Sequence, residues 1–113
     1  MTASFLVRLE QACEVSRSLL CVGLDPDPDL MPVADVFGFN QAIIDATAGL
    51  VCAYKPNTAF YEALGVPGLD ALARTVEYIR RVAPQVIVIG DAKRGDVGPS
   101  GRAYAQAAFD VWG

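Results

Sequence analysis

The stretch GDAKRGDVG, residues 90–98, places two carboxylates and two cations directly behind an apolar run, VIVI. Asp91 and Lys93 are two residues apart, so an extended backbone would point both side chains to the same face. Carboxylates beside a lysine favour its ammonium form, and such a lysine can stabilise negative charge on a substrate and then protonate it. A solvated turn carries similar charges, and DxKxxD is a short pattern, so the surrounding elements must distinguish an active site from a surface loop.

Three apolar segments predict the strands that would position these charges. They cover residues 18–25, 50–57 and 85–91, with Asp25, Lys55 and Asp91 at or near their ends. Continuous apolar runs of this length are typical of strands buried on both faces in parallel sheets. The carboxyl ends of such strands meet at one edge, where α/β proteins hold their sites. Three charged strand ends favour a functional site over a solvated loop.

The spacing of apolar residues predicts helices before, between and after these strands. It predicts a helix over 4–17 with Ser4 as N-cap, one over 36–48 closed by Gly49, a short one near 59–64, a long amphipathic one that stops at Pro84, and a last one over 100–112. Strand, turn and helix recur three times without hairpin signals, which predicts an α/β fold with three parallel strands and crossover helices. Part of a (β/α)8 barrel and an open doubly wound sheet both fit. The sequence lacks GxGxxG and GxxxxGK[ST] motifs, which disfavours nucleotide-binding open sheets.

Composition excludes several classes of function. The 113 residues are 53% hydrophobic and carry a net charge of −4, which argues against general nucleic-acid binding. No apolar run reaches the roughly 20 residues of a membrane span, and the N-terminus lacks a signal-peptide pattern, so we expect a cytoplasmic protein. Histidine is absent, which removes imidazole acid–base chemistry. The three cysteines are expected to be small buried hydrophobes and not a disulfide or metal site: Cys13, Cys21 and Cys52.

Three stretches resemble the orotidine 5′-phosphate decarboxylase family, most closely its longer bacterial branch. They are CVGLDPDP (21–28), FNQAIIDATAGLVCAYKPNTAFYEALG (39–65), and VIVIGDAKRGDVG (86–98) followed by AYAQAAF (103–109). The resemblance implies a (β/α)8 TIM barrel that acts as a homodimer on a small nucleotide. It implies decarboxylation of orotidine 5′-monophosphate to uridine 5′-monophosphate, in de novo pyrimidine synthesis, with neither a metal nor an organic cofactor.

The resemblance also implies a role for each matched residue at the strand ends. Asp25 would bind a ribose hydroxyl of the substrate, and Lys55 would bind ribose and join the charge network. Asp91 would lie beside the departing carboxylate. Lys93 would protonate the pyrimidine carbon that the carboxylate leaves, which agrees with the chemistry expected of a fixed cation beside a carbanion-like centre.

Two further matched residues lie beyond the strand end. Asp96 would reach across a dimer interface into the partner subunit's site. Ser100 stands where many relatives carry a threonine that contacts the partner's ligand, and it retains the hydroxyl. Arg94 is expected to be a surface or interface residue. Of the residues after the second strand, Tyr61 is expected to pack and Asn57 is a modest candidate for a polar contact.

The length departs from the family pattern. A full barrel needs about 250 residues and eight strands, so we expect residues 1–113 to be the N-terminal part of a barrel domain that stops before the fourth strand. Such a portion would expose an unpaired strand edge and apolar helix faces. We therefore expect these residues alone to lack appreciable decarboxylase activity.

Two other interpretations stay open. Magnesium-dependent sugar-phosphate decarboxylases and aldolases of the same superfamily, such as 3-keto-L-gulonate 6-phosphate decarboxylase, share the fold and the DxKxxD motif and would use the carboxylates partly for metal. The YKPN and GLDPDP stretches favour the orotidylate branch. The other interpretation is a non-catalytic half-barrel that folds only by pairing or does not fold, which predicts no ligand binding.

Overall fold

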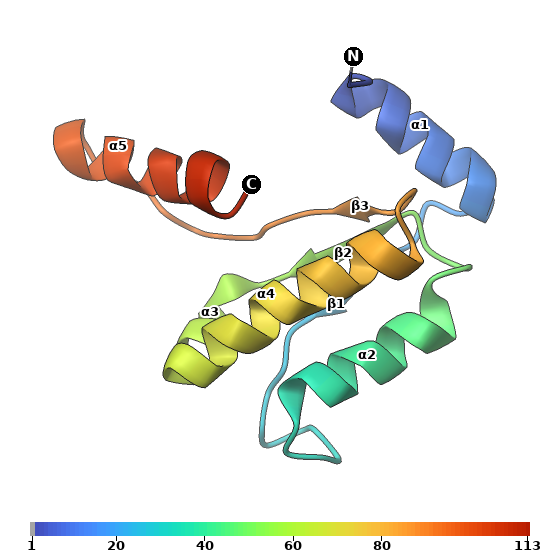
Figure 1. The fold of residues 1–113 in the computed structure, drawn as a ribbon, viewed down its shortest axis with the longest axis horizontal. Helices are drawn as coiled ribbons and strands as arrows, with labels where there is room; N and C mark the ends of the chain where they lie inside the picture. The colour runs from blue at the N-terminus through green and yellow to red at the C-terminus, as the bar shows by residue number, and fades with distance from the viewer. Residues whose placement is uncertain (1) are drawn as a thin grey trace.

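The structure, a computed structural model, describes residues 2–113 and contains one three-stranded parallel sheet with its helices (Figure 1). The strands lie in the order β1-β2-β3, and each crossover between them is helical, as the sequence predicts. In chain order the elements are α1 (Phe5–Ser16), β1 (Cys21–Leu24), α2 (Val36–Thr47), β2 (Ala53–Pro56), α3 (Thr58–Glu62), α4 (Gly65–Val82), β3 (Ile87–Val88), α5 (Gly98–Gln106) and the π-helical turn η1 (Ala107–Val111).

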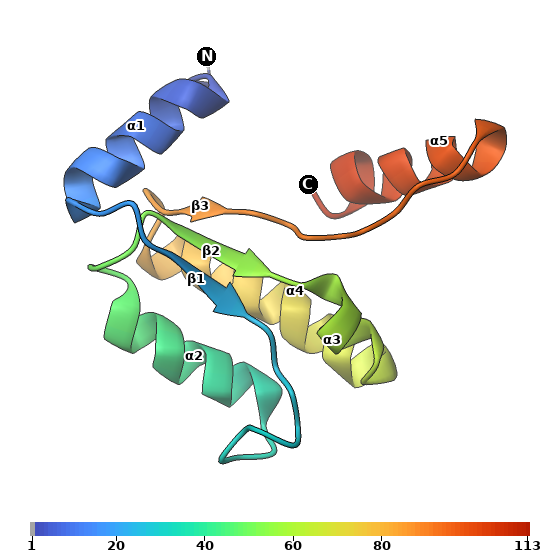
Figure 2. The ribbon, with the colours of Figure 1, turned by 180° about the vertical axis from the view of Figure 1, so that it is seen from behind.

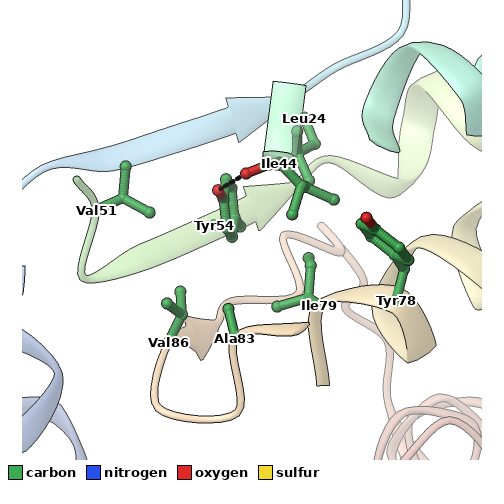
Figure 3. Packing of buried hydrophobic residues seen from close by; sticks show 8 residues of the cluster. All are labelled: Leu24, Ile44, Val51, Tyr54, Tyr78, Ile79, Ala83 and Val86. Atoms are coloured by element: carbon green, nitrogen blue, oxygen red, sulfur yellow. Dashed lines mark hydrogen bonds between the residues drawn. The ribbon is translucent and has the colours of Figure 1, made fainter. Parts of the chain in front are cut away.

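Helices α2 and α4 cover one face of the sheet, and the main core lies between them and the strands (Figures 1 and 2). Figure 3 shows this cluster, in which Tyr54 donates a hydrogen bond from its hydroxyl to the Ile44 carbonyl at 3.4 Å. Full burial of one large apolar side chain stabilises a fold by about 1.5–3 kcal/mol, so this cluster is the main support of the sheet. Its buried members are Leu24, Ile44, Val51, Tyr54, Tyr78, Ile79, Ala83 and Val86.

Alternation along the strands sends neighbouring side chains to opposite faces of the sheet. In β2, Tyr54 points into the core beneath α2 and α4, whereas Ala53 packs with Ala12 of α1. Helix α1 therefore lies against the opposite face, near the start of β2 and β3 (Figure 2). Its predicted N-cap is confirmed, because the Ser4 hydroxyl accepts a hydrogen bond from the Val7 amide at 3.4 Å.

The prediction that the first strand is buried on both faces is wrong. Leu20 is 53% exposed, and Cys21 is exposed as well. β1 is an edge strand, and α1 covers the second face of the sheet only beside β2 and β3. For the same reason the expectation of buried cysteines holds for Cys52 but not for Cys21, while Cys13 is half-buried.

Strand β3 is shorter than the predicted 85–91: residues 85 and 86 belong to the turn after α4, and Pro56 in β2 explains the early end at Val88. The Ile89 amide donates to the Tyr54 carbonyl at 2.8 Å, and the Asp91 amide donates to the Pro56 carbonyl at 3.0 Å. The bond between them in the ladder would run from residue 56 to the Ile89 carbonyl, and proline has no N–H to donate. Regular pairing therefore stops at Val88 and resumes as an isolated bridge between Asn57 and Asp91.

The helix ends differ from the predictions in detail. The C-cap of α2 is Ala48, and Gly49 does not adopt the positive φ of a glycine cap. The last helix begins at Gly98, two residues before the predicted start, and it has no buried residue. Within residues 2–113, no helix is both long and apolar enough to cross a membrane.

Candidate active site

Asp25, Lys55 and Asp91 lie on the face of the sheet that α2 and α4 leave free. Leu24, Tyr54 and Val88 point toward those helices, so the odd-numbered neighbours point the other way. The register places Gly23 opposite Lys55 and Asn57 opposite Asp91. The predicted convergence of three charged strand ends is therefore present in the fold.

Both backbone polar groups of Asp91 form hydrogen bonds with the end of β2 and the residues after it. Its amide donates to the Pro56 carbonyl at 3.0 Å, and its carbonyl accepts from the Thr58 amide at 3.0 Å. Pro56 also restricts Lys55, the residue before it, to extended conformations. The backbone is thereby restrained at both strand ends that carry these charges.

The Asp91 carboxylate pairs with Lys93, as their spacing predicts. Lys93 Nζ donates to Asp91 Oδ1 and Oδ2, each at 2.7 Å. The Asp91 side chain is 21% exposed and that of Lys93 is 77% exposed, so the ammonium faces the open side of the pair. These hydrogen bonds lower the pKa of Asp91 below its ordinary value; partial burial opposes the shift, and the charges of Lys93 and Lys55 reinforce it.

The Asp25 carboxylate connects the ends of β1 and β2. Its Oδ1 accepts a hydrogen bond from the Asn57 amide at 3.3 Å. A Cβ added at Gly23 would lie 3.4 Å from Asp25 Oδ2, so the carboxylate lies back over the strand at the residue paired with Lys55. Together the strand ends present a row of alternating charge, which suits a substrate with an anionic group and sugar hydroxyls.

Asp96 and Ser100 lie apart from this group. Asp96 Oδ1 accepts from the Val97 amide at 2.7 Å, just before α5, and both residues are exposed. Across the described part of the chain, neither forms a hydrogen bond or ion pair with the other predicted site residues. Gly101 is needed beside Asp96, because a Cβ there would approach the Asp96 carbonyl oxygen to 2.6 Å. The predicted roles of Asp96 and Ser100 concern a second subunit and stay predictions.

Arg94 has a structural role that its sequence position does not reveal. Its guanidinium forms an ion pair with Glu62 of α3 and lies 5.9 Å from the centre of the Tyr104 ring on α5. Arg94 thus ties the loop after Lys93 to two helices. Glu62 lies 32 residues from Arg94 in the sequence, so no local pattern predicts their contact. Arg94 is exposed, as expected of a surface residue, and its ion-paired side chain is 30% exposed.

Comparisons with known proteins show a matching family and similar proteins. The model of the orotidine 5′-phosphate decarboxylase / HUMPS family matches residues 18–113. The orotidine 5′-phosphate decarboxylase of Dehalococcoides mccartyi (strain BAV1) is 55% identical over 107 residues, which cover 94% of this chain and 38% of that protein. The corresponding enzyme of Herpetosiphon aurantiacus is 51% identical over 115 residues, with 96% and 42% covered.

A solved structure gives the same relation. The structure of Leishmania donovani OMP decarboxylase superposes with a TM-score of 0.80 at 37% identity, covering 97% of this chain and 41% of that one. The predicted fold class, part of a (β/α)8 barrel with three parallel strands and crossover helices, is confirmed. The chain spans about two fifths of the length of the curated relatives that it matches.

Proposed function

Because the chain belongs to the orotidine 5′-phosphate decarboxylase / HUMPS family, we propose that the protein carrying it converts orotidine 5′-monophosphate to uridine 5′-monophosphate and carbon dioxide, in pyrimidine biosynthesis. The observation that carries the proposal is the Lys93 ammonium held on both oxygens of Asp91 at the end of β3. The names of the curated relatives favour this substrate over a sugar phosphate.

The charge pair fits the chemistry of decarboxylation. Breaking the bond to the leaving carbon dioxide places an electron pair on the pyrimidine carbon. A cation already fixed beside that carbon stabilises the charge as it develops and then supplies the proton. In this proposal Lys93 is that cation, and Asp91 holds it while facing the substrate carboxylate. The anchored backbone of Asp91 supports the role, since pre-organised groups need little rearrangement during reaction.

The remaining predicted residues are assigned to binding. Asp25 and Lys55 lie on the same face of the sheet as Asp91 and would bind the ribose, with Lys55 also part of the charge network. Asp96 and Ser100 would act on a second subunit's ligand in a homodimer, which agrees with their exposed position away from the other four. We assign residues 1–113 to the N-terminal part of a barrel domain in a cytoplasmic enzyme, and the rest of the barrel would supply the phosphate and base contacts.

The test is turnover by the full-length protein. Wild-type protein should convert orotidine 5′-monophosphate, and Lys93→Ala should lower kcat by at least about a thousandfold. Arg8→Ala, which removes an exposed cation on α1, is the matched control and should retain wild-type activity. Absence of turnover by the wild-type protein, or full activity of Lys93→Ala, would contradict the proposal.

Two further assays distinguish this proposal from the magnesium-dependent enzymes and test the isolated chain. Activity that persists in EDTA agrees with the proposal, whereas activity that EDTA abolishes and magnesium restores indicates the sugar-phosphate branch. The 113-residue chain assayed by itself should show no measurable turnover, because it spans only about two fifths of the length of the related enzymes. Turnover by the isolated chain would overturn that expectation.

A further inference from the structure

A buried polar cluster lies directly beneath the end of β1. Asn40, Tyr61 and Thr75 come from α2, α3 and α4, and each is 0% exposed. Asn40 Nδ2 lies 3.0 Å from Tyr61 Oη and 3.1 Å from Thr75 Oγ1. The cluster therefore joins three helices through buried hydrogen bonds.

The directions of these hydrogen bonds are determined by the available protons. The Tyr61 hydroxyl donates to the Leu24 carbonyl at 2.8 Å, and the Thr75 hydroxyl donates to the Ala71 carbonyl at 2.7 Å. Each hydroxyl has given away its only proton, so each must accept from the Asn40 amide group, which has two protons to donate. Asn40 thereby fixes the rotation of the Tyr61 hydroxyl toward Leu24.

The Asn40 cluster fixes the directions of hydrogen bonds more than it stabilises the fold. Within residues 2–113 the buried Asn40 Oδ1 has no hydrogen-bond partner, and an unsatisfied buried polar atom is costly. Apolar side chains of similar size would avoid that cost. What they would not provide is a donor aimed at one particular carbonyl, that of Leu24.

Leu24 precedes Asp25, and the contacts close into a ring around that residue. The Asp25 carboxylate accepts from the Asn57 amide at 3.3 Å, and the Asn57 side chain caps α3 by accepting from the Ala59 amide at 3.2 Å. Helix α3 carries Tyr61, which reaches back to Leu24. The ring fixes the peptide that leads into Asp25 and also the amide that its carboxylate contacts.

We propose that Tyr61, oriented by Asn40, is a positioning residue that sets the Asp25 carboxylate for a sugar hydroxyl of the substrate. Because Tyr61 is fully buried, its role in this proposal is to act on substrate through Asp25. The choice of substrate rests on the function proposed above, whereas the coupling between Tyr61 and Asp25 rests on the hydrogen bonds alone.

The first test is a double-mutant cycle in the full-length protein. Tyr61→Phe removes one oxygen and should lower kcat/KM for orotidine 5′-monophosphate about fivefold, mainly through KM, because one hydrogen bond that orients a binding group is lost. In an Asp25→Ala background the same change should have no further effect. Tyr78→Phe is the matched control, since its hydroxyl donates to Asp45 on α2, and it should leave kcat/KM unchanged. Equal losses in both backgrounds would show that Tyr61 acts independently of Asp25 and would overturn the proposal.

The second test needs no substrate. The amide proton resonance of Asn57 should move as the Asp25 carboxylate is titrated, because the two share a hydrogen bond. Tyr61→Phe should at least halve that movement, Thr75→Val should reduce it less, and Tyr78→Phe should leave it unchanged. An unaltered movement in Tyr61→Phe would overturn the positioning role. A halved movement in a protein that does not turn over orotidine 5′-monophosphate would instead retain the positioning role and overturn the proposed substrate.

Discussion

Alkaline pH should destabilise this fold through Tyr61. Burial raises the pKa of Tyr61 to about 12 from an ordinary 10.0; the Asn40 hydrogen bond lowers it slightly, and the negative charge of Asp25 raises it. The unfolded chain therefore releases this proton at a lower pH than the folded chain does. Stability that depends on neutral Tyr61 is fully present below about pH 10 and is lost as the pH rises through about 12.

The size of the effect follows from the difference between the two pKa values. About two pKa units correspond to about 2.7 kcal/mol of free energy of unfolding. Domains of this size have a total stability of about 5–15 kcal/mol, so ionisation of one phenol removes a sizeable fraction of it. Ionisation of Tyr61 should lower the free energy of unfolding wherever Tyr61 stays buried in the folded protein.

Urea unfolding across the alkaline range measures this loss. The free energy of unfolding should fall between about pH 9 and pH 12 in the wild-type protein by about 2–3 kcal/mol more than in Tyr61→Phe, which has no proton to release. Tyrosinate absorbance should show one fewer late-titrating phenol in the variant. An identical decline in the two proteins would refute the assignment of the loss to Tyr61.

Three other perturbations test the site and its support. A double-mutant cycle on Arg94→Gln and Glu62→Gln should give a coupling energy of about 0.5–1 kcal/mol in urea unfolding, as for a partly exposed pair, and a coupling of zero would remove the proposed tie between loop and helix. Carbon NMR should show the pKa of the Asp91 carboxyl below its ordinary value, and Lys93→Met should raise it. The stability that the ionised group contributes is present above the ordinary pKa and is lost as the pH falls through the lowered one. Ile79→Ala should cost about 2–5 kcal/mol, because Ile79 is fully buried between α4 and the sheet, and a loss under 1 kcal/mol would mean that the core collapses into the space.

The part of the fold that the sequence predicts depends on residues that are close together in the chain. Apolar runs and helical spacing predict the order of elements, and two-residue alternation predicts that Asp91 and Lys93 meet. The parallel topology then brings Asp25 and Lys55 to the same face without further information. Each of these steps uses only local periodicity and the rule that parallel strands share an edge.

Contacts between distant residues could not be predicted in this way. The Tyr61 hydroxyl and the Leu24 carbonyl are 37 residues apart, and the Arg94 and Glu62 side chains are 32 apart. A tyrosine in an apolar segment has the same pattern whether its hydroxyl is solvated or aimed at one carbonyl. The exposure of β1 has a related reason, because composition does not tell which strands α1 covers.

Pro56 also interrupts the pairing of β2 with β3 at a point where the interruption costs little. In the observed pairing the missing N–H faces Ile89, which is 41% exposed, so solvent can satisfy the carbonyl there. A proline at position 54, one pairing earlier in β2, would instead turn the missing donor toward Ile87, which is 4% exposed. Leaving that buried carbonyl unpaired would cost about 1–3 kcal/mol. The position of the proline thus restricts Lys55 to extended conformations without removing a buried hydrogen bond.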